Sequence, residues 1–282
     1  MEIKKLGVVG AGTMGNGIAQ IAAQIGCEVV MRDIEMRFVE GGIKKIEAFL
    51  AKSVEKGKLE AKEKDAILGR IKGTVDMADL KDVDLVVEAV LEDLDLKKSV
   101  FKELDEICRP EVILATNTSS MSITEIAAST KRPDKVCGMH FFNPVPLMRL
   151  VEVIRGYATS DETIRVTTDL AQRMGKTTIE VKKDSPGFVV NRIMTPHFIE
   201  AIKIVEEGIA SIEDVDTAVK NGLNYPMGPF ELMDLTGIDI AYHVTEYLYK
   251  ELNKENKWVS PNLLKTMIRS GNLGRKTGKG WY

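Results

Sequence analysis

Short apolar runs alternate with longer amphipathic stretches along the first two thirds of the chain. Continuous Val, Ile and Leu runs are typical of strands buried on both faces of a parallel sheet. Such runs predict strands at 84–90 and 112–116, and further strands are predicted at 6–9, 28–32, 136–139, 150–154 and 177–181. Apolar residues at helical spacing predict helices at 18–25, 96–107, 123–128 and 161–174. This alternation predicts an α/β fold built on a doubly wound sheet.

Two amphipathic segments interrupt the alternation after residue 33. They run from Phe38 to Val54 and from about Glu60 to Ile71, with Gly57 between them. Both are rich in lysine and glutamate, as expected of a protruding helical hairpin over about 38–71. Two interpretations of its lysines stay open. They form a solvated face, or some of them contact a phosphorylated substrate tail.

The stretch Asp184-Ser185-Pro186-Gly187 predicts a domain boundary, because proline and glycine disfavour regular structure. Beyond it the strand pattern disappears and only helical spacing remains, at 188–207, 212–220, 230–252 and 261–269. We therefore expect two domains. The first, 1–184, carries the sheet, and the second, 185–282, is all-helical and expected to serve substrate binding and dimerisation.

Composition narrows the class of protein. A length of 282 residues with 44% hydrophobic and 29% charged residues is typical of an ordinary globular chain with room for two domains. The net charge of −3 offers no general attraction to nucleic acid or an anionic membrane. No apolar run approaches the length of a membrane span. The first predicted strand begins near Met1, so we expect no signal or transit peptide. Three scattered cysteines suit a reducing compartment, so we expect a cytoplasmic protein.

A glycine-rich turn joins the first strand to the first helix. In Gly-x-Gly-x-x-Gly, Gly10 takes the turn, Gly12 lets a pyrophosphate approach the backbone and Gly15 lets the helix pack closely. A turn without a ligand is the alternative interpretation. The second strand ends at Asp33, where a ribose hydroxyl needs an acceptor, so the pattern favours a Rossmann-type NAD site. Arg32 leaves NADP open.

His140 differs from the other two histidines because it ends a predicted strand beside asparagine and prolines. His197 and His243 lie in predicted helices and are interpreted as packing residues. Glu152 is an isolated carboxylate in an apolar strand, and it would be costly to bury unpaired. Paired with His140, it would fix the imidazole tautomer and stabilise the charged form. An edge-strand glutamate facing water is the alternative. No ligand spacing for a metal is present, so a histidine base beside a nicotinamide indicates hydride transfer.

At this point several motifs together resemble one family. They are Gly-Ala-Gly-Thr-Met-Gly at 10–15, Asn-Thr-Ser-Ser at 117–120, His-Phe-Phe-Asn-Pro-Val-Pro at 140–146, Leu-Val-Glu at 150–152, and the segments 184–192 and 274–282. The whole chain resembles the short-chain 3-hydroxyacyl-CoA dehydrogenase family, closest to its bacterial members that act on 3-hydroxybutyryl-CoA. The resemblance implies reversible hydride transfer between NAD(H) and an acyl-CoA substrate, in a homodimer formed through the helical domain.

The resemblance also implies roles for individual residues. His140 is similar to the family's general acid/base, and Glu152 to its orienting partner. Ser119 and Asn191 correspond to the groups that hydrogen-bond the C3 oxygen of the substrate. Because Asn191 belongs to the second domain, the resemblance places the active site between the two domains.

Binding residues follow from the same motifs. For NAD the resemblance implies Gly10, Gly12, Thr13, Met14, Gly15, Asp33, Glu92, Lys97, Asn117, Ser119, Asn143 and Arg275, with Lys276 as the alternative to Arg275. For coenzyme A the hairpin is the expected contact region, with Lys52, Ser53 and Lys56 as candidates.

Other functions are compatible with part of the pattern. A dehydrogenase of longer or broader 3-hydroxyacyl-CoA chains, or of a free 3-hydroxy acid, would use the same chemistry, although a lysine-rich hairpin favours a phosphorylated tail. A non-catalytic relative that kept the fold is the other alternative. Its weakness is the intact polar set of Ser119, His140, Glu152 and Asn191, from which a scaffold gains nothing.

Overall fold

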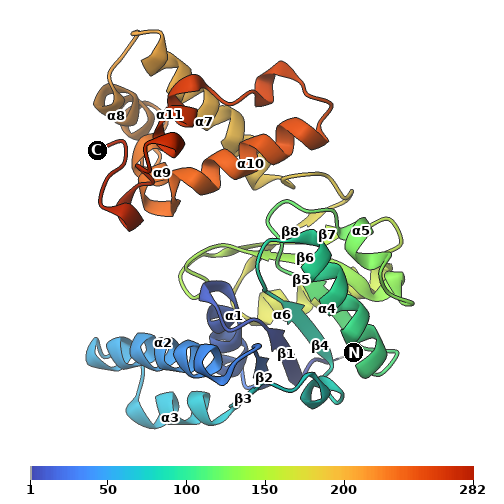
Figure 1. Cartoon of the computed structure of the whole chain (residues 1–282). Helices are drawn as coiled ribbons and strands as arrows, with labels where there is room; N and C mark the ends of the chain where they lie inside the picture. The colour runs from blue at the N-terminus through green and yellow to red at the C-terminus, as the bar shows by residue number, and fades with distance from the viewer. Residues whose placement is uncertain (1) are drawn as a thin grey trace. The chain divides into compact units, whose positions relative to one another are not determined.

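The computed structural model describes residues 2–282 and divides into two compact units, 1–184 and Ser185–Tyr282. Each unit has its own core, and Figure 1 shows their elements. Within residues 2–282, no helix has both the length and the apolar character that a membrane crossing requires.

The first unit is built on one eight-stranded sheet with the order β3-β2-β1-β4-β5-β6-β7-β8. Its strands are β1 (Lys5–Val9), β2 (Glu28–Arg32), β3 (Ile71–Thr74), β4 (Leu85–Glu88), β5 (Ile113–Thr116), β6 (Val136–Phe141), β7 (Leu150–Arg155) and β8 (Thr177–Val181). All neighbouring strands are parallel except β6 and β7, which are antiparallel. The chain adds strands on one side of β1 up to β3 and then on the other side from β4 onward. This reversal confirms the predicted doubly wound, Rossmann-type fold.

Helices cover both faces of this sheet (Figure 1). On one face α1 (Thr13–Gln24), α2 (Met36–Glu55) and α6 (Asp161–Arg173) pack over a core that includes Val8, Met31 and Val87. On the opposite face lie α4 (Leu94–Ile107) and α5 (Ile123–Ala127). Because side chains alternate along a strand, residues next to that core point to α4 and α5. Glu88, His140 and Glu152 are among them.

The predicted hairpin is present as α2 and α3 (Ala61–Gly69), and the chain turns between them at Gly57, whose φ is 66°. Strand β3 is a correction, because the sequence pattern placed Ile71 in the second hairpin helix and predicted no strand there. A four-residue edge strand containing lysine and glycine carries too weak an apolar signal to be recognised. A Cβ on Gly73 would lie 2.5 Å from Val39 Cγ1, so the glycine permits close packing of α2 on this strand.

The second unit is all-helical, as predicted. It contains α7 (Val190–Glu206), α8 (Ile212–Gly222), α9 (Pro229–Thr236), α10 (Ile238–Glu251) and α11 (Asn262–Arg269). The single helix predicted over 230–252 is wrong, because α9 and α10 are separated at Gly237, whose φ of 109° no helix accommodates. Ile202, Phe230 and Met233 lie at the centre of the core of this unit.

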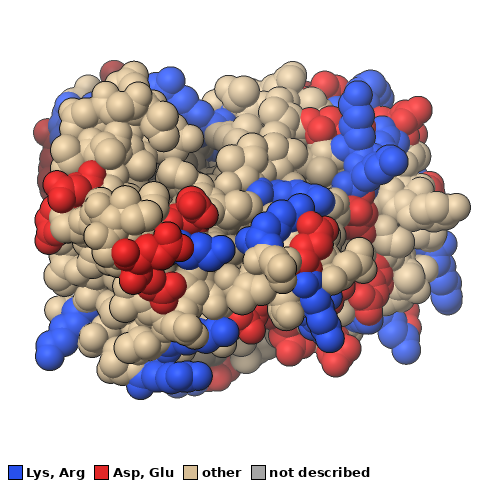
Figure 2. All heavy atoms as spheres, turned by 90° about the horizontal axis from the view of Figure 1, so that it is seen from above, with Lys and Arg blue, Asp and Glu red and all other residues tan. Residues whose placement is uncertain are grey.

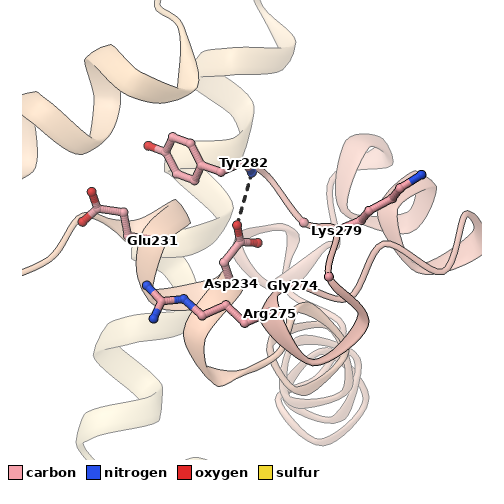
Figure 3. Close-up of a pocket in the computed structure, with 8 residues that line it drawn as sticks. Glu231, Asp234, Gly274, Arg275, Lys279 and Tyr282 are labelled. Carbon is pink, nitrogen blue, oxygen red and sulfur yellow. Dashed lines mark hydrogen bonds between the residues drawn. The ribbon is translucent and has the colours of Figure 1, made fainter.

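Short 3₁₀ helices complete the fold at η1 (Met77–Leu80), η2 (Pro133–Lys135), η3 (Asn256–Trp258) and η4 (Arg275–Thr277). The last residues of the chain are held by two buried carboxylates. Asp234 accepts a hydrogen bond from the N–H of Trp281 at 2.9 Å. It also accepts one from the N–H of Tyr282 at 3.2 Å (Figure 3). Asp216 accepts from the Tyr282 hydroxyl at 2.8 Å. The segment after η4 is therefore an integral part of the helical unit.

Acidic and basic side chains are interspersed over the face shown in Figure 2. This mixture matches the nearly balanced counts of 42 acidic and 39 basic residues. The face in view therefore presents no extended field of one sign that would attract a polyanion.

Candidate active site

The central parallel strands end at a common edge. Val9 of β1 pairs in register with Glu88 of β4, which pairs with Thr116 of β5. The loops after these strands contain most of the predicted site residues of the first unit. In open α/β sheets ligands bind at this carboxyl edge, where the strand order reverses.

The glycine turn after β1 has the geometry that a dinucleotide needs. Gly10 has a φ of 103°, and a Cβ there would lie 2.5 Å from Ala89 O. A Cβ on Gly15 would lie 1.7 Å from Gly10 O, so only glycine lets α1 start this close to the strand. At Gly12 a Cβ would meet nothing within 4 Å, which leaves open space above the helix N-terminus. Thr13 and Met14 form its first turn, whose N–H groups and dipole suit a diphosphate.

Asp33 lies just after β2 beside this turn. Its Oδ2 accepts the Ala11 N–H at 2.7 Å and its Oδ1 accepts the Ile34 N–H at 2.7 Å. The carboxylate therefore holds the turn as well as lying where a ribose hydroxyl is expected. The sequence pattern predicted only the second role.

His140 and Glu152 face each other across the antiparallel pair of β6 and β7. The distance from His140 Nδ1 to Glu152 Oε2 is 2.7 Å, and the two residues are 6% and 0% exposed. The alternative of a water-facing glutamate is therefore wrong. A carboxylate at Nδ1 requires the proton on that nitrogen, which makes Nε2 the proton-exchanging atom of the ring. The Phe142 ring lies 4.4 Å from the imidazole, centroid to centroid.

The loop after β5 carries Asn117 and Ser119. Asn117 Oδ1 accepts the Phe141 N–H at 2.9 Å, which ties this loop to the strand that carries His140. Glu92 Oε1 accepts both the Ser119 N–H at 2.8 Å and the Ser119 hydroxyl at 3.2 Å. Two predicted site residues, Glu92 and Ser119, are thus in direct contact in the first unit.

Lys97 is buried beneath these loops. It lies on α4 and is 1% exposed, and its Nζ is 2.8 Å from Glu88 Oε1 and 3.3 Å from Glu92 Oε2. A direct contact with the cofactor stays a prediction. Sequence reasoning missed Glu88, a charged residue at the end of an apolar strand. The signal that singled out Glu152 was present there too.

The other predicted residues lie on separate elements. Asn143 is exposed in the loop after β6, and Asn191 is half-buried at the start of α7 in the second unit. On α2, Lys52 and Lys56 flank the half-buried Ser53; both lysines are exposed, and the second is the C-cap. The Ser53 hydroxyl donates to Phe49 O at 3.2 Å, and the binding roles of all these residues stay predictions.

Arg275 lines a pocket of about 480 Å³ in the second unit, together with Glu231, Asp234 and Tyr282 (Figure 3). The Lys220 ammonium, 2.6 Å from Glu231, holds the pKa of that carboxyl below its usual value, and the Arg275 charge acts in the same direction. The alternative candidate, Lys276, pairs with Asp239 at 2.6 Å. A cofactor contact of either residue stays a prediction.

Metal and thiol chemistry find no support in the described residues. Among residues 2–282 no three histidine, cysteine or acidic side chains are arranged to hold a metal ion. All three cysteines are buried, and burial raises the pKa of Cys108 to about 11 and that of Cys137 to about 12. Their thiols are therefore core groups and poor nucleophiles.

The fold and this site define a class. A Rossmann-type sheet, an open glycine turn with an acid beside it and a buried histidine–glutamate pair at the same edge are the parts of a nicotinamide-dependent dehydrogenase. Residues 5–185 match the model of the 3-hydroxyacyl-CoA dehydrogenase NAD binding domain, and residues 187–282 match the model of the C-terminal domain of the same family. The chain belongs to the 3-hydroxyacyl-CoA dehydrogenase family, as its motifs predicted.

Similar proteins cover essentially the whole chain. A probable 3-hydroxybutyryl-CoA dehydrogenase of Deinococcus radiodurans is 50% identical over 99% of this chain and 99% of the relative. A 3-hydroxybutyryl-CoA dehydrogenase of Clostridioides difficile is 48% identical over 99% of this chain and 98% of the relative. The crystal structure of (S)-3-hydroxybutyryl-CoA dehydrogenase from Ralstonia eutropha has a TM-score of 0.96 at 47% identity, covering 100% of this chain and 99% of that one.

Proposed function

We propose that this chain is an NAD-dependent 3-hydroxybutyryl-CoA dehydrogenase that interconverts (S)-3-hydroxybutyryl-CoA and acetoacetyl-CoA. The observation that carries the proposal is the buried contact of 2.7 Å between His140 and Glu152 near the carboxyl end of a sheet with an NAD turn. The full-length similarity to proteins of that name supports the choice of substrate.

His140 acts as the general acid/base. In the oxidation direction, Nε2 takes the proton of the C3 hydroxyl, and in the reduction direction it returns that proton to the C3 oxygen. Glu152 accepts the Nδ1–H, holds this tautomer and stabilises the imidazolium that forms. NAD(H), when bound, supplies the hydride acceptor or donor.

Two hydrogen-bonding groups complete the substrate site in this proposal. The Ser119 hydroxyl contacts the C3 oxygen, which gains negative charge as the carbonyl is reduced. Asn191 is assigned the same role from its place at the start of α7. Lys52, Ser53 and Lys56 on the exposed side of α2 bind the phosphorylated part of coenzyme A.

One assay tests the proposal and separates the alternatives. The purified protein is given NADH with acetoacetyl-CoA, then with longer 3-ketoacyl-CoA thioesters and with free 3-keto acids. We expect the highest kcat/KM with the four-carbon thioester. Preference for a longer acyl chain would indicate a dehydrogenase of longer or broader specificity. Equal activity on free 3-keto acids would show that coenzyme A is not recognised. No oxidation of NADH with any substrate would indicate a non-catalytic relative.

Cofactor choice gives a first prediction. The Asp33 carboxylate, fixed by Ala11 N–H at 2.7 Å, would repel the 2′-phosphate of NADPH. We expect kcat/KM for NADH to exceed that for NADPH, and Asp33→Ser to narrow the ratio. Steady-state kinetics with both cofactors measure the ratio of kcat/KM for NADH to that for NADPH. A wild-type preference for NADPH would contradict the role of Asp33.

Assembly and location belong to the same proposal. We infer a cytoplasmic location because the three cysteines are unpaired and buried. We also infer a homodimer formed through the helical unit. Three large apolar side chains are exposed there, Ile193 of α7, Leu235 of α9 and Ile240 of α10. Sedimentation velocity should give the mass of two chains, and Ile193→Glu should shift it toward one.

A further inference from the structure

A buried ion pair lies directly below the loops of the candidate site. Glu88 is the last residue of β4, and Lys97 is in the first turns of α4. They are 0% and 1% exposed, and Lys97 Nζ is 2.8 Å from Glu88 Oε1. Removing two charges from water is costly, so such a pair persists only when its geometry satisfies both partners.

Both carboxylate oxygens of Glu88 have further donors. Oε1 accepts the Val90 N–H at 2.7 Å, and Oε2 accepts the Thr116 hydroxyl at 2.7 Å. Val90 follows Ala89, against which the Gly10 turn packs, and Thr116 is two residues before Thr118. One carboxylate thus fixes the loops that follow β4 and β5 in relation to each other.

Lys97 connects this pair to the substrate side of the site. Its ammonium is closer to Glu88, at 2.8 Å, than to Glu92, whose Oε2 is 3.3 Å away. The other oxygen of Glu92 accepts the hydroxyl of Thr118 and both the N–H and the hydroxyl of Ser119. Glu92 is therefore shared between one buried cation and the loop that carries Ser119.

We propose that Glu88 is a positioning residue that controls Ser119 through Lys97 and Glu92. By neutralising Lys97, Glu88 limits the attraction of the ammonium for Glu92. Glu92 Oε1 then stays on the Ser119 N–H, 2.8 Å away, and holds the backbone from which the serine hydroxyl turns to the substrate oxygen. Without the Glu88 charge, Glu92 is the nearest remaining carboxylate in this network, and the ammonium draws it away from the serine. The catalytic meaning of this arrangement depends on the proposed function, because Ser119 is there assigned to the substrate oxygen.

The test is a double-mutant cycle between Glu88→Gln and Ser119→Ala. The amide of Glu88→Gln keeps the volume of the side chain and removes the charge. Its oxygen can still accept from the Val90 N–H and Lys97, and its NH2 group can donate to the Thr116 hydroxyl. We expect it to lower kcat, measured at saturating NADH, about ten-fold, as for other supporting residues. In the Ser119→Ala background the same change should alter kcat by less than about two-fold. An equal loss in both backgrounds would overturn the proposal.

A second ion pair on the same helix provides the matched control. Asp105, near the other end of α4, is nearly buried and lies 2.6 Å from Arg132 Nε. Asp105→Asn should lower Tm but leave kcat unchanged. Adding Lys97→Met to Glu88→Gln removes the unpaired cation, so the crystal structure of this double variant should show Glu92 Oε1 back on the Ser119 N–H. Its absence there would count against the proposal.

Crystal structures of wild type, Glu88→Gln and Asp105→Asn give a readout that needs no turnover. The contact of 2.8 Å from the Ser119 N–H to Glu92 Oε1 should be lost in Glu88→Gln and kept in Asp105→Asn. If Glu88→Gln keeps it, the proposal is wrong. A wild-type protein that oxidises no NADH would refute the proposed function, while this comparison would still decide the positioning role.

Discussion

Glu152 has no contact with solvent, so the groups that face it must balance its charge. His140 lies directly opposite in the strand register, and its ring contacts Phe142 on another side. Both residues therefore have a single orientation set by the sheet and its packing. Such preorganisation is what a proton-transfer group needs, because no reorganisation is then required during the reaction.

Removing the imidazole tests this assignment. We expect His140→Ala to lower kcat by about 10²–10⁴, the usual contribution of general acid/base catalysis, with the Kd for NADH unchanged. Turnover and fluorescence titration of NADH measure the two effects. His243→Ala is the control, since that histidine is exposed on α10 and contacts the ring of Tyr242. Near-normal turnover of His140→Ala would end the assignment.

His197 gives a prediction about pH. Partial burial near the rings of Phe198 and Tyr225 lowers the pKa of His197 below 6.5. The unfolded chain then binds more protons than the folded one, so stability falls as the pH drops below 6.5 toward the lowered pKa, and it is regained as the pH rises again. Urea unfolding at about pH 5 and about pH 8 measures this dependence. It should be weaker in His197→Phe, and an equal dependence in both proteins would contradict the role of His197.

At the scale of elements, the turn after α11 depends on glycine in two different ways. Gly274 has a φ of 89°, and a Cβ there would lie 2.5 Å from Asp234 O. Gly271 has a φ of 72°, and a Cβ there would meet nothing within 4 Å. Both positions have a positive φ, but Gly274, with a ψ of −155°, lies in a backbone region that essentially only glycine adopts, and it also has the close contact.

We therefore expect two different costs of adding a methyl group. Gly271→Ala should destabilise the helical unit by about 1–2 kcal/mol, the cost of left-handed backbone alone. Gly274→Ala should cost about 1–3 kcal/mol more, because the methyl group overlaps the end of α9. Urea unfolding followed by tryptophan fluorescence compares them. Equal losses would show that the contact with Asp234 relaxes freely.

The sequence predicted the elements whose signal is local. Strands β1, β2 and β4–β7 lie in mostly apolar runs, β8 is a short stretch rich in β-branched residues, and most helices have clear amphipathic spacing. Strand β3 was missed because Gly73 and Lys72 serve the packing of α2 and the sheet edge, which is tertiary information. The break at Gly237 was missed because one glycine inside an apolar helix pattern does not reveal its φ.

In the candidate site, too, the sequence predicted the features that have a local signal. The contact of His140 with Glu152 followed from one buried-strand acid, and the glycine turn followed from its spacing. The burial of Lys97 could not be predicted, because a lysine at the start of an amphipathic helix is usually solvated. Glu88 carried the same sequence signal as Glu152, an acid in an apolar strand, but its pairing with Lys97 depends on the packing of α4 on β4.

At the scale of the whole molecule, the distribution of two residue types is uneven. Cys27, Cys108 and Cys137 all lie in the first unit, and all are buried. Trp258 and Trp281 both lie in the second unit and are buried there. The chain has no other cysteine or tryptophan.

This distribution supplies a label-free reporter for each half of the chain. Reaction of thiols with a chromogenic disulfide follows unfolding of the first unit, and indole emission follows the second. NADH at about a hundred times its Kd should stabilise the half that binds it by about 2.7 kcal/mol. We expect it to raise the urea midpoint for thiol reaction more than the midpoint for emission; equal shifts would mean that the halves unfold as one. In any engineered variant or fusion, thiol reaction and indole emission would show which of the two units has lost stability.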